Sequence, residues 1–143
     1  DSLMELIFLQ SVASAQALAN TGQVGETLPS PAMSDEQIGP VLREIRVFPA
    51  KPWTLPMMAK RAKLSRSAFA DRFRRLVGQS PLQYLTDVRM TLACKLLTTE
   101  ALSVSTIATM VGYENGSSFS NSFKKWSQQS PLAFRRSRRS YER

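Results

Sequence analysis

A repeat with a period of about fifty residues is the feature that most limits how this chain can fold. The stretch Gln-Ser-Pro-Leu at 79–82 recurs at 129–132. The side chains that precede the two copies match at the same spacings: Ser67, Phe69, Phe73, Arg74, Arg75 and Leu76 in the first, and Ser117, Phe119, Phe123, Lys124, Lys125 and Trp126 in the second. Further upstream the second copy holds one extra residue. Two such copies predict a duplicated helix-turn-helix with turns of two lengths.

The composition suits one domain of ordinary size, or a small domain with an appendage. The chain has 143 residues, of which 43% are hydrophobic, and it begins with Asp1, so we expect it to be a piece of a longer protein. No apolar run is long enough to span a membrane. The single cysteine, Cys94, excludes an internal disulfide and fits a reducing compartment such as the cytoplasm. Histidine is absent and no catalytic constellation is present, so we expect no enzyme, metal or cofactor.

Positive charge is concentrated in the repeat. The formal net charge is +8. Residues 1–50 hold two basic and six acidic side chains, whereas residues 51–143 hold 17 basic and five acidic ones. The second part therefore carries a net charge of +12. A solvated surface would also carry such charge, but a basic half that coincides with helix-turn-helix patterns favours a polyanion as partner.

The segment before the repeat divides into a helix and a linker. Residues 2–20 predict a helix that is apolar around most of its girth and so needs a partner. That partner could be the rest of the chain, a second copy or an upstream domain. Residues 21–34 are rich in Gly and Pro and predict a linker. Ser34, with Gln37 as its capping-box partner, is then expected to begin the next helix.

Two helix-turn-helix units are predicted, at about 54–77 and about 103–127. Ser65 is the expected cap of the second helix in the first unit. In the second unit Asn115 and Ser117 are alternative caps.

A long helix over about 81–98 is predicted to join the units. It would span roughly 27 Å, and Cys94 within it is expected to be a buried structural thiol. Two units that read successive major grooves on one face need centres about 34 Å apart. The helix and the width of the flanking units can supply that distance.

Helical spacing divides the second helix of each unit into an aromatic inner face and a polar outer face. In a helix-turn-helix this helix enters the major groove and its N-terminal part meets base edges. The candidate base readers are Ser67, Ala70, Asp71, Gly116, Ser117, Ser118 and Asn121. The candidate phosphate contacts are Arg66, Arg74, Arg75, Lys124, Lys125, Arg135 and Arg136. Short polar side chains can instead only cap and solvate helices, and the C-terminal arginines could equally form a solvated tail.

The segment from about 35 to 139 resembles the C-terminal DNA-binding domain of the AraC/XylS family of bacterial transcription regulators. The residues that carry the resemblance are Trp53-Thr54-Leu55, Met58-Ala59, Ser65-Arg66-Ser67-Ala68-Phe69, Arg72-Phe73-Arg74, Ser80-Pro81-Leu82-Gln83-Tyr84-Leu85, Arg89-Met90, Ala93, Leu96-Leu97, Ile107-Ala108, Val111-Gly112-Tyr113, Ser118-Phe119-Ser120, Phe123-Lys124-Lys125 and Ser130-Pro131. They cover about two-thirds of the chain.

The resemblance implies an all-α domain in which a long helix joins two helix-turn-helix units on one face of double-stranded DNA. It also implies activation of transcription through contact with RNA polymerase, and an upstream effector-binding domain that forms homodimers. Residues 1–20 would then be the last helix of that upstream domain, 21–34 the linker and 35–143 the DNA-binding domain.

Two positions depart from the family pattern. The family often has Arg where this chain has Asp71 and Asn121. Asp71 could accept from a cytosine amino group, or pair with Arg74 or Arg75 on its own helix; we favour the pairing. Asn121 could pair with adenine. The second unit also lacks the family's glycine at Gln128.

The predicted function is sequence-specific DNA binding by a transcription regulator in the bacterial cytoplasm, at the nucleoid. The alternative is a protein-interaction module that has lost specific DNA binding and acts on RNA polymerase or another regulator. Asp71 and Asn121 favour this alternative, and the charge of the basic half argues against it.

Overall fold

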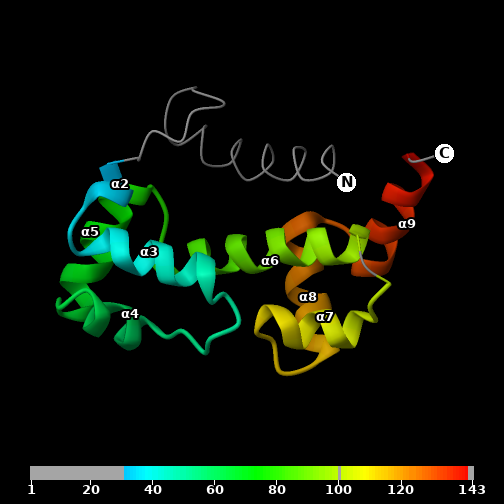
Figure 1. Cartoon of the computed structure of the whole chain (residues 1–143), viewed down its shortest axis with the longest axis horizontal. Helices are drawn as coiled ribbons and strands as arrows, with labels where there is room; N and C mark the ends of the chain where they lie inside the picture. The colour runs from blue at the N-terminus through cyan, green and yellow to red at the C-terminus, as the bar shows by residue number, and fades with distance from the viewer. Residues whose placement is uncertain (1–30, 100, 142–143) are drawn as a thin grey trace. The chain divides into compact units, whose positions relative to one another are not determined.

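The computed structural model describes residues 31–99 and 101–141, with side chains as far as Arg138 (Figure 1). All regular structure in these residues is α-helical, which confirms the predicted all-α class. They form two compact units, 31–88 and 89–141, and helix α6 runs from the first into the second. The helix expected over 2–20 and most of the expected linker lie outside the described residues.

The first unit contains α2 (Pro31–Ser34), α3 (Ile38–Val47), α4 (Leu55–Arg61), α5 (Arg66–Val77) and the start of α6 (Pro81–Thr99). Helices α4 and α5 form a helix-turn-helix in the range expected for the first one. Besides contacting each other, α5 and α3 both contact the short α2.

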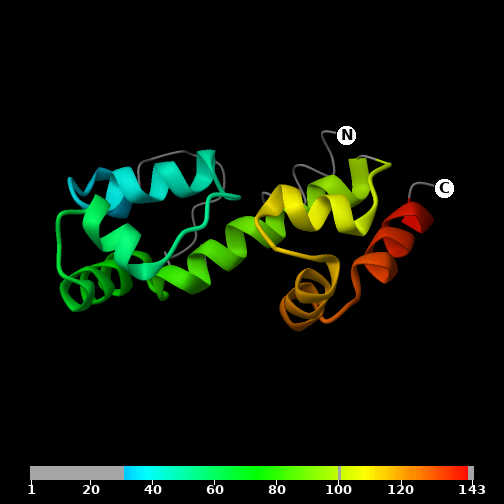
Figure 2. The same ribbon diagram turned by 90° about the horizontal axis from the view of Figure 1, so that it is seen from below.

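The second unit contains the remainder of α6, α7 (Val104–Val111), α8 (Gly116–Ser127) and α9 (Pro131–Tyr141). Figure 2 looks nearly along α8 and side-on at α7, so these two helices cross steeply. They form the second helix-turn-helix, again in the expected range. Cys94 is fully buried on α6, and this burial raises the pKa of its thiol.

Three aromatic side chains hold the first unit together. Phe69 and Phe73 on α5 are fully buried, with ring centroids 5.6 Å apart. Tyr84 on α6 meets Phe73 edge-on at 5.7 Å. Its hydroxyl accepts a hydrogen bond of 2.8 Å from Nε of Arg46, so the buried phenol is satisfied. Burial raises the pKa of Tyr84.

The second unit repeats this arrangement at the equivalent positions. Phe119 and Phe123 on α8 are fully buried at 5.7 Å, and Phe134 on α9 meets Phe123 edge-on at 5.5 Å. Phe134 stands where the first unit has Tyr84, and no partner for a hydroxyl is needed there. In both units the aromatic side of the recognition-type helix faces inward, as the spacing predicts.

Side-chain oxygens cap the starts of both recognition-type helices. Oγ of Ser65 accepts from the backbone N–H of Ala68 at 3.2 Å. Oδ1 of Asn115 accepts from the N–H of Ser118 at 2.8 Å. Of the two alternatives for the second unit, the cap is therefore Asn115. Each cap satisfies one of the N–H groups that a helix start leaves without a partner.

The start of α3 differs from the sequence-based expectation. Ser34 does not cap it, because Ser34 is the last residue of α2. Asp35 takes this role: its Oδ1 accepts from the backbone N–H groups of Gln37 and Ile38, both at 2.9 Å. A carboxylate at a helix start also interacts favourably with the helix dipole.

Within residues 31–99 and 101–141, four residues with left-handed backbone turn the chain, two in each unit. In the first unit Lys63 (φ 59°) lies in the turn and Gly78 (φ 88°) ends α5. In the second unit glycine takes the other position: Gly112 (φ 103°) lies in the turn and Gln128 (φ 69°) ends α8. Each unit therefore places one residue with a Cβ atom in a conformation that only glycine adopts without strain.

We expect Gln128→Gly to stabilise the chain by about 1 kcal/mol, because it removes the Cβ strain at the end of α8. Chemical denaturation of the variant and the wild type would measure the difference. Gln128→Ala is the control, since it shortens the side chain but keeps the strain. An unchanged midpoint for Gln128→Gly would contradict the expectation.

Candidate nucleic-acid interface

Helix α5 presents a polar and mostly cationic face to solvent. Ser67 and Asp71, two of the predicted base readers, are exposed, and Ala70 is half-buried between them. The predicted phosphate contacts Arg66, Arg74 and Arg75 are also exposed. Four of these side chains, Ser67, Asp71, Arg74 and Arg75, share the face opposite the buried aromatic rings. Ala70 lies at the edge of that face, and Arg66 lies in the first turn of α5.

The ion pair favoured for Asp71 is not formed. Within the part of the chain that the structure describes, Asp71 makes no ion pair with Arg74 or Arg75. The three side chains instead line an open hollow of about 400 Å³. An exposed ion pair within one helix contributes only roughly 0.3–0.5 kcal/mol to stability, so hydration of the separate charges competes with pairing. The Asp71 carboxylate therefore remains accessible to an outside donor.

Helix α8 presents the equivalent face of the second unit. Ser117, Ser118 and Asn121 are exposed and Gly116 is half-buried. Because Asn115 provides the cap, the Ser117 hydroxyl is not needed for it. The Ser118 hydroxyl is partly engaged, since it lies 3.2 Å from Oδ1 of Asn115.

Lys124 and Lys125 are exposed in the last turn of α8, at the positions that Arg74 and Arg75 occupy on α5. Helix α8 carries no acidic residue, whereas α5 carries Asp71. Both helices can therefore offer two adjacent cations to a phosphate backbone, and their outer faces differ mainly in the short polar side chains.

Arg135, predicted as a phosphate contact, has a structural role instead. Its Nε donates to the carbonyl oxygen of Leu97 at 2.9 Å, and its Nη2 donates to that of Leu102 at 2.5 Å. These carbonyls lie near the C-terminal end of α6 and just before α7. Arg136 is exposed. The expected basic tail is helical here, because α9 continues to Tyr141.

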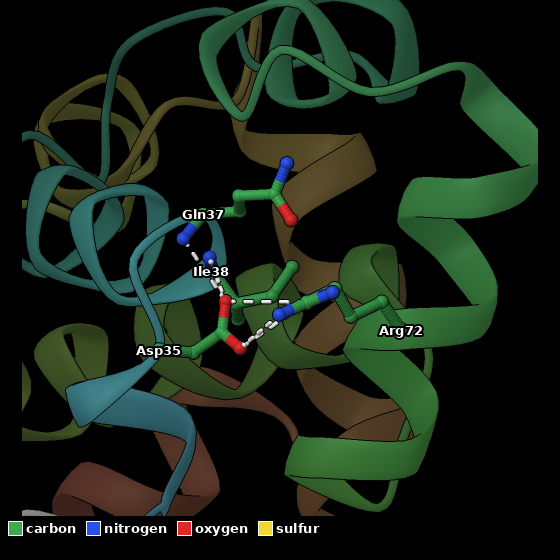
Figure 3. A network of polar contacts seen from close by, with 4 residues as sticks. All are labelled: Asp35, Gln37, Ile38 and Arg72. Carbon is green, nitrogen blue, oxygen red and sulfur yellow. Dashed lines mark hydrogen bonds and ion pairs between the residues drawn. The ribbon is translucent and has the colours of Figure 1, made fainter.

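A second interaction that sequence patterns did not predict joins Asp35 to Arg72 on α5 (Figure 3). Nη2 of Arg72 lies 2.7 Å from Oδ2 of Asp35, and Nε lies 3.1 Å from the same oxygen and 3.3 Å from Oδ1. The Asp35 side chain is only 11% exposed. Its hydrogen bonds, above all with Arg72, lower the Asp35 pKa from 3.8 to about 2. The pair spans 37 positions, so only the position of Asp35 just before an apolar helical stripe could have suggested its capping role.

The first unit has one more basic surface, which lies outside α5. Lys51, Lys60, Arg61 and Lys63 line an open hollow of about 430 Å³ beside Trp53. Nζ of Lys51 stands 4.7 Å from the centre of the Trp53 ring. Arg61 is engaged by Glu44, with Nε 2.7 Å from Oε1. These cations add to the positive potential of the first unit.

Residues 31–99 and 101–141 contain no group of three or more His, Cys, Asp or Glu side chains that could hold a metal ion. In the same residues no helix is both long and apolar enough to cross a membrane.

Comparison with known proteins identifies the family. The profile of a helix-turn-helix domain family matches residues 58–137. The chain belongs to the AraC family. The chain is 35% identical over 135 residues to the HTH-type transcriptional regulator AlkR of Acinetobacter baylyi, and the match covers 94% of this chain and 43% of AlkR. It is 37% identical over 87 residues to the transcriptional activator RclR of Escherichia coli, covering 61% of this chain and 31% of RclR.

Solved AraC-type structures share the fold. The DNA-binding domain of AdpA, solved in complex with a target DNA, matches with a TM-score of 0.72 and 29% identity, covering 75% of this chain and 96% of that one. The C-terminal domain of AraT from Geobacillus stearothermophilus matches with a TM-score of 0.62 and 32% identity, covering 69% and 86%. The chain spans less than half the length of AlkR and about a third of RclR.

These comparisons confirm the predicted family. The predicted function, a DNA-binding transcription regulator, agrees with the names of the relatives, and they do not favour the protein-interaction alternative.

The Asp35 pKa predicts a defined loss of stability in acid. The pKa of Asp35 in the folded protein, about 2, lies below the ordinary value of 3.8, so the paired carboxylate stabilises the fold above pH 4. This contribution is lost as the pH falls through the folded value. Asp35→Asn should therefore lower the free energy of unfolding at pH 7 and narrow its difference from wild type near pH 2. Denaturant titrations at several pH values would measure this, with the exposed carboxylate variant Glu114→Gln as control. A gap that is constant with pH would contradict the assignment.

Arg135 and Arg136 should behave differently when changed. Arg135→Met should lower the stability of the chain by roughly 1.5–3 kcal/mol, because two backbone carbonyls lose a charged donor. Arg136→Met should lower the stability less, because Arg136 is exposed and the interactions of an exposed charged side chain contribute only about 0–1 kcal/mol. Thermal melts of both variants test the distinction. Equal and small effects would show that the Arg135 contacts do not hold α9 in place.

Proposed function

We propose that this chain is the DNA-binding part of a transcription regulator, and that α5 and α8 each insert into the major groove of double-stranded DNA. The observation that carries the proposal is the duplicated recognition surface. In both units a helix buries two phenylalanines on one side, and on the other it exposes short polar residues followed by a pair of cations. The structure of the similar AdpA domain contains a target DNA, which supports DNA as the partner.

Under this proposal the position of a residue on its helix decides whether it contacts bases or phosphates. Residues in the first turns approach base edges, so Ser67, Ala70 and Asp71 read one part of the site, and Gly116, Ser117, Ser118 and Asn121 read the other. Arg66, Arg74, Arg75, Lys124 and Lys125 contact phosphates, which set register rather than sequence. Arg136 is a further phosphate candidate. Arg135 is left out, because its guanidinium is engaged with backbone carbonyls.

Asp71 and Asn121 have separate base preferences under this proposal. A carboxylate can accept from the amino group of cytosine, and an amide can pair with adenine. The accessible Asp71 carboxylate supports direct reading rather than an intrahelical pair.

The proposal extends to the longer protein of which this chain is a part. Segments before residue 35 would connect to an effector-binding and dimerising domain, with 1–20 as its last helix and 21–34 as linker. The intact regulator would act at the nucleoid in the bacterial cytoplasm, without catalytic activity, and would activate transcription through RNA polymerase. The name of RclR, a transcriptional activator, supports the direction of regulation.

The first experiment is selection of bound duplexes from a random-sequence pool at two salt concentrations. Enrichment of a site with two short blocks about one helical turn apart is expected for two recognition helices. Tight binding without enrichment would overturn sequence-specific reading. No binding even at low salt would favour the protein-interaction alternative.

Salt dependence tests the phosphate contacts. Arg74→Ala and Lys124→Ala should weaken binding to all duplexes, and each should reduce the slope of log K against log salt by about 0.9, because each removes one neutralised phosphate. Thr99→Ala, an exposed and uncharged change on α6, is the matched control. Unchanged slopes in both cation variants would refute their role.

A further inference from the structure

The segment just before α3 is attached to recognition helix α5. Helix α2 contacts both α3 and α5, and Ala32 is buried in the core of the first unit. Asp35 follows α2 directly and binds Arg72, at the middle of α5 (Figure 3). Asp35 also precedes the residues matched by the family profile, which begin at 58. The contact therefore joins a residue outside the matched range, Asp35, to one inside it, Arg72.

The geometry of the contact restrains rotation of α5. The guanidinium of Arg72 is a planar fork, and both Nε and Nη2 donate to one carboxylate. That carboxylate is held in turn by two backbone N–H groups at the start of α3. Both ends of the bridge are thus anchored, one on the α3 backbone and one on α5.

Small rotations of α5 would matter for base reading. Side-chain ends lie roughly 5–6 Å from a helix axis, so a rotation of about 10° moves them by about 1 Å. A displacement of that size exceeds what hydrogen bonding to a base edge tolerates. Arg72 is adjacent in sequence to Asp71 and lies halfway along α5, so the restraint acts close to the proposed base readers.

At the position of α8 that matches Arg72, the described part of the second unit has no such ion pair. The residue fifty positions after Arg72 is Ser122, which is half-buried and too short to reach across to another helix. The restraint is therefore particular to α5, and the two halves of a bound site should respond differently to its loss.

We propose that Asp35 is a positioning residue for DNA reading: through Arg72 it sets the orientation of α5 and thereby the base preference of the first unit. This inference rests on the proposed DNA-binding function. Asp35 does not touch DNA in this role.

Asp35→Asn removes the ion pair with Arg72 but keeps the cap at the start of α3. Asparagine keeps an oxygen that can accept from the N–H groups of Gln37 and Ile38, but it loses the charge and the second acceptor that Arg72 uses. Glu44→Gln is the matched control, because it weakens another ion pair of the first unit, at 2.7 Å, that joins α3 to α4 and does not reach α5.

The test uses the whole 143-residue chain and the duplex that the wild type selects. Duplexes with single base changes compete with this duplex for binding, which gives the penalty of each mismatch. The block that α5 reads is the one whose base preference changes in Asp71→Ala. For the wild type a mismatch should weaken binding by about 5- to 150-fold. In Asp35→Asn the mismatch penalties should shrink by at least about threefold in the block that α5 reads and stay the same in the other block. The slope of log K against log salt should not change. Glu44→Gln should leave both blocks unchanged.

Arg72→Met provides a second variant with the stem retained, and it should reproduce the block-specific loss. Circular dichroism at the binding temperature ensures that each variant is folded. Penalties equal to the wild type, or a uniform loss in both blocks, would overturn the positioning role while leaving the proposed function in place. A wild-type chain without any base preference would overturn the proposed function and, with it, this inference.

Discussion

Burial of the paired phenylalanines on α5 and α8 is the constraint on which the remaining structure depends. Phe69 and Phe73, like Phe119 and Phe123, stand four positions apart and are fully removed from solvent. A helix that buries such a stripe has only one side left for solvent. Short polar residues and cations occupy that side in both units. Core packing and the composition of the proposed DNA-facing surface are therefore two consequences of one helical period.

Polar side chains complete the units by satisfying backbone groups. Ser65, Asn115 and Asp35 accept from N–H groups at helix starts, and Arg135 donates to carbonyls around the end of α6. Such groups are costly when left without partners. Two of these residues, Asp35 and Arg135, are charged and yet turn inward. Their charges serve the protein itself rather than a partner, which separates them from the exposed cations of α5 and α8.

The two units solve the same problem with different residues. Tyr84 needs Arg46 to satisfy its hydroxyl, whereas Phe134 at the equivalent position needs nothing. Glycine takes the left-handed turn in one unit and the left-handed helix end in the other. The reading surfaces differ as well, with a carboxylate on α5 and only neutral and basic side chains on α8. A duplicated scaffold with unlike surfaces suits a site made of two unlike blocks.

Sequence by itself determined the helices of the two repeated units, their inner faces and the Ser65 cap. It left Asn115 and Ser117 as alternative caps of α8 and did not identify Asp35 at the start of α3. Turn glycines, Ser and Asn caps and the 3.6-residue period act within a few positions of one another. The fifty-residue repeat showed that the same patterns apply to the second unit. Local patterns also placed the exposed face of α5 and α8, including Ser67 and Lys124. The assignment of those side chains to bases or phosphates stays a prediction, because it depends on a bound duplex.

Tertiary structure alone decided which charged residues turn inward. Arg72 meets Asp35 across 37 positions, and Arg135 meets Leu97 and Leu102 across 38 and 33. In the sequence Arg135 and Arg136 lie in one basic run, and only the repeat separates them, because it aligns Arg135 with the buried Leu85. What separates them in the folded chain is the direction of each side chain on a packed helix and the presence of unpaired carbonyls within its reach. Those conditions exist only after the helices have packed, so no local pattern could reveal them.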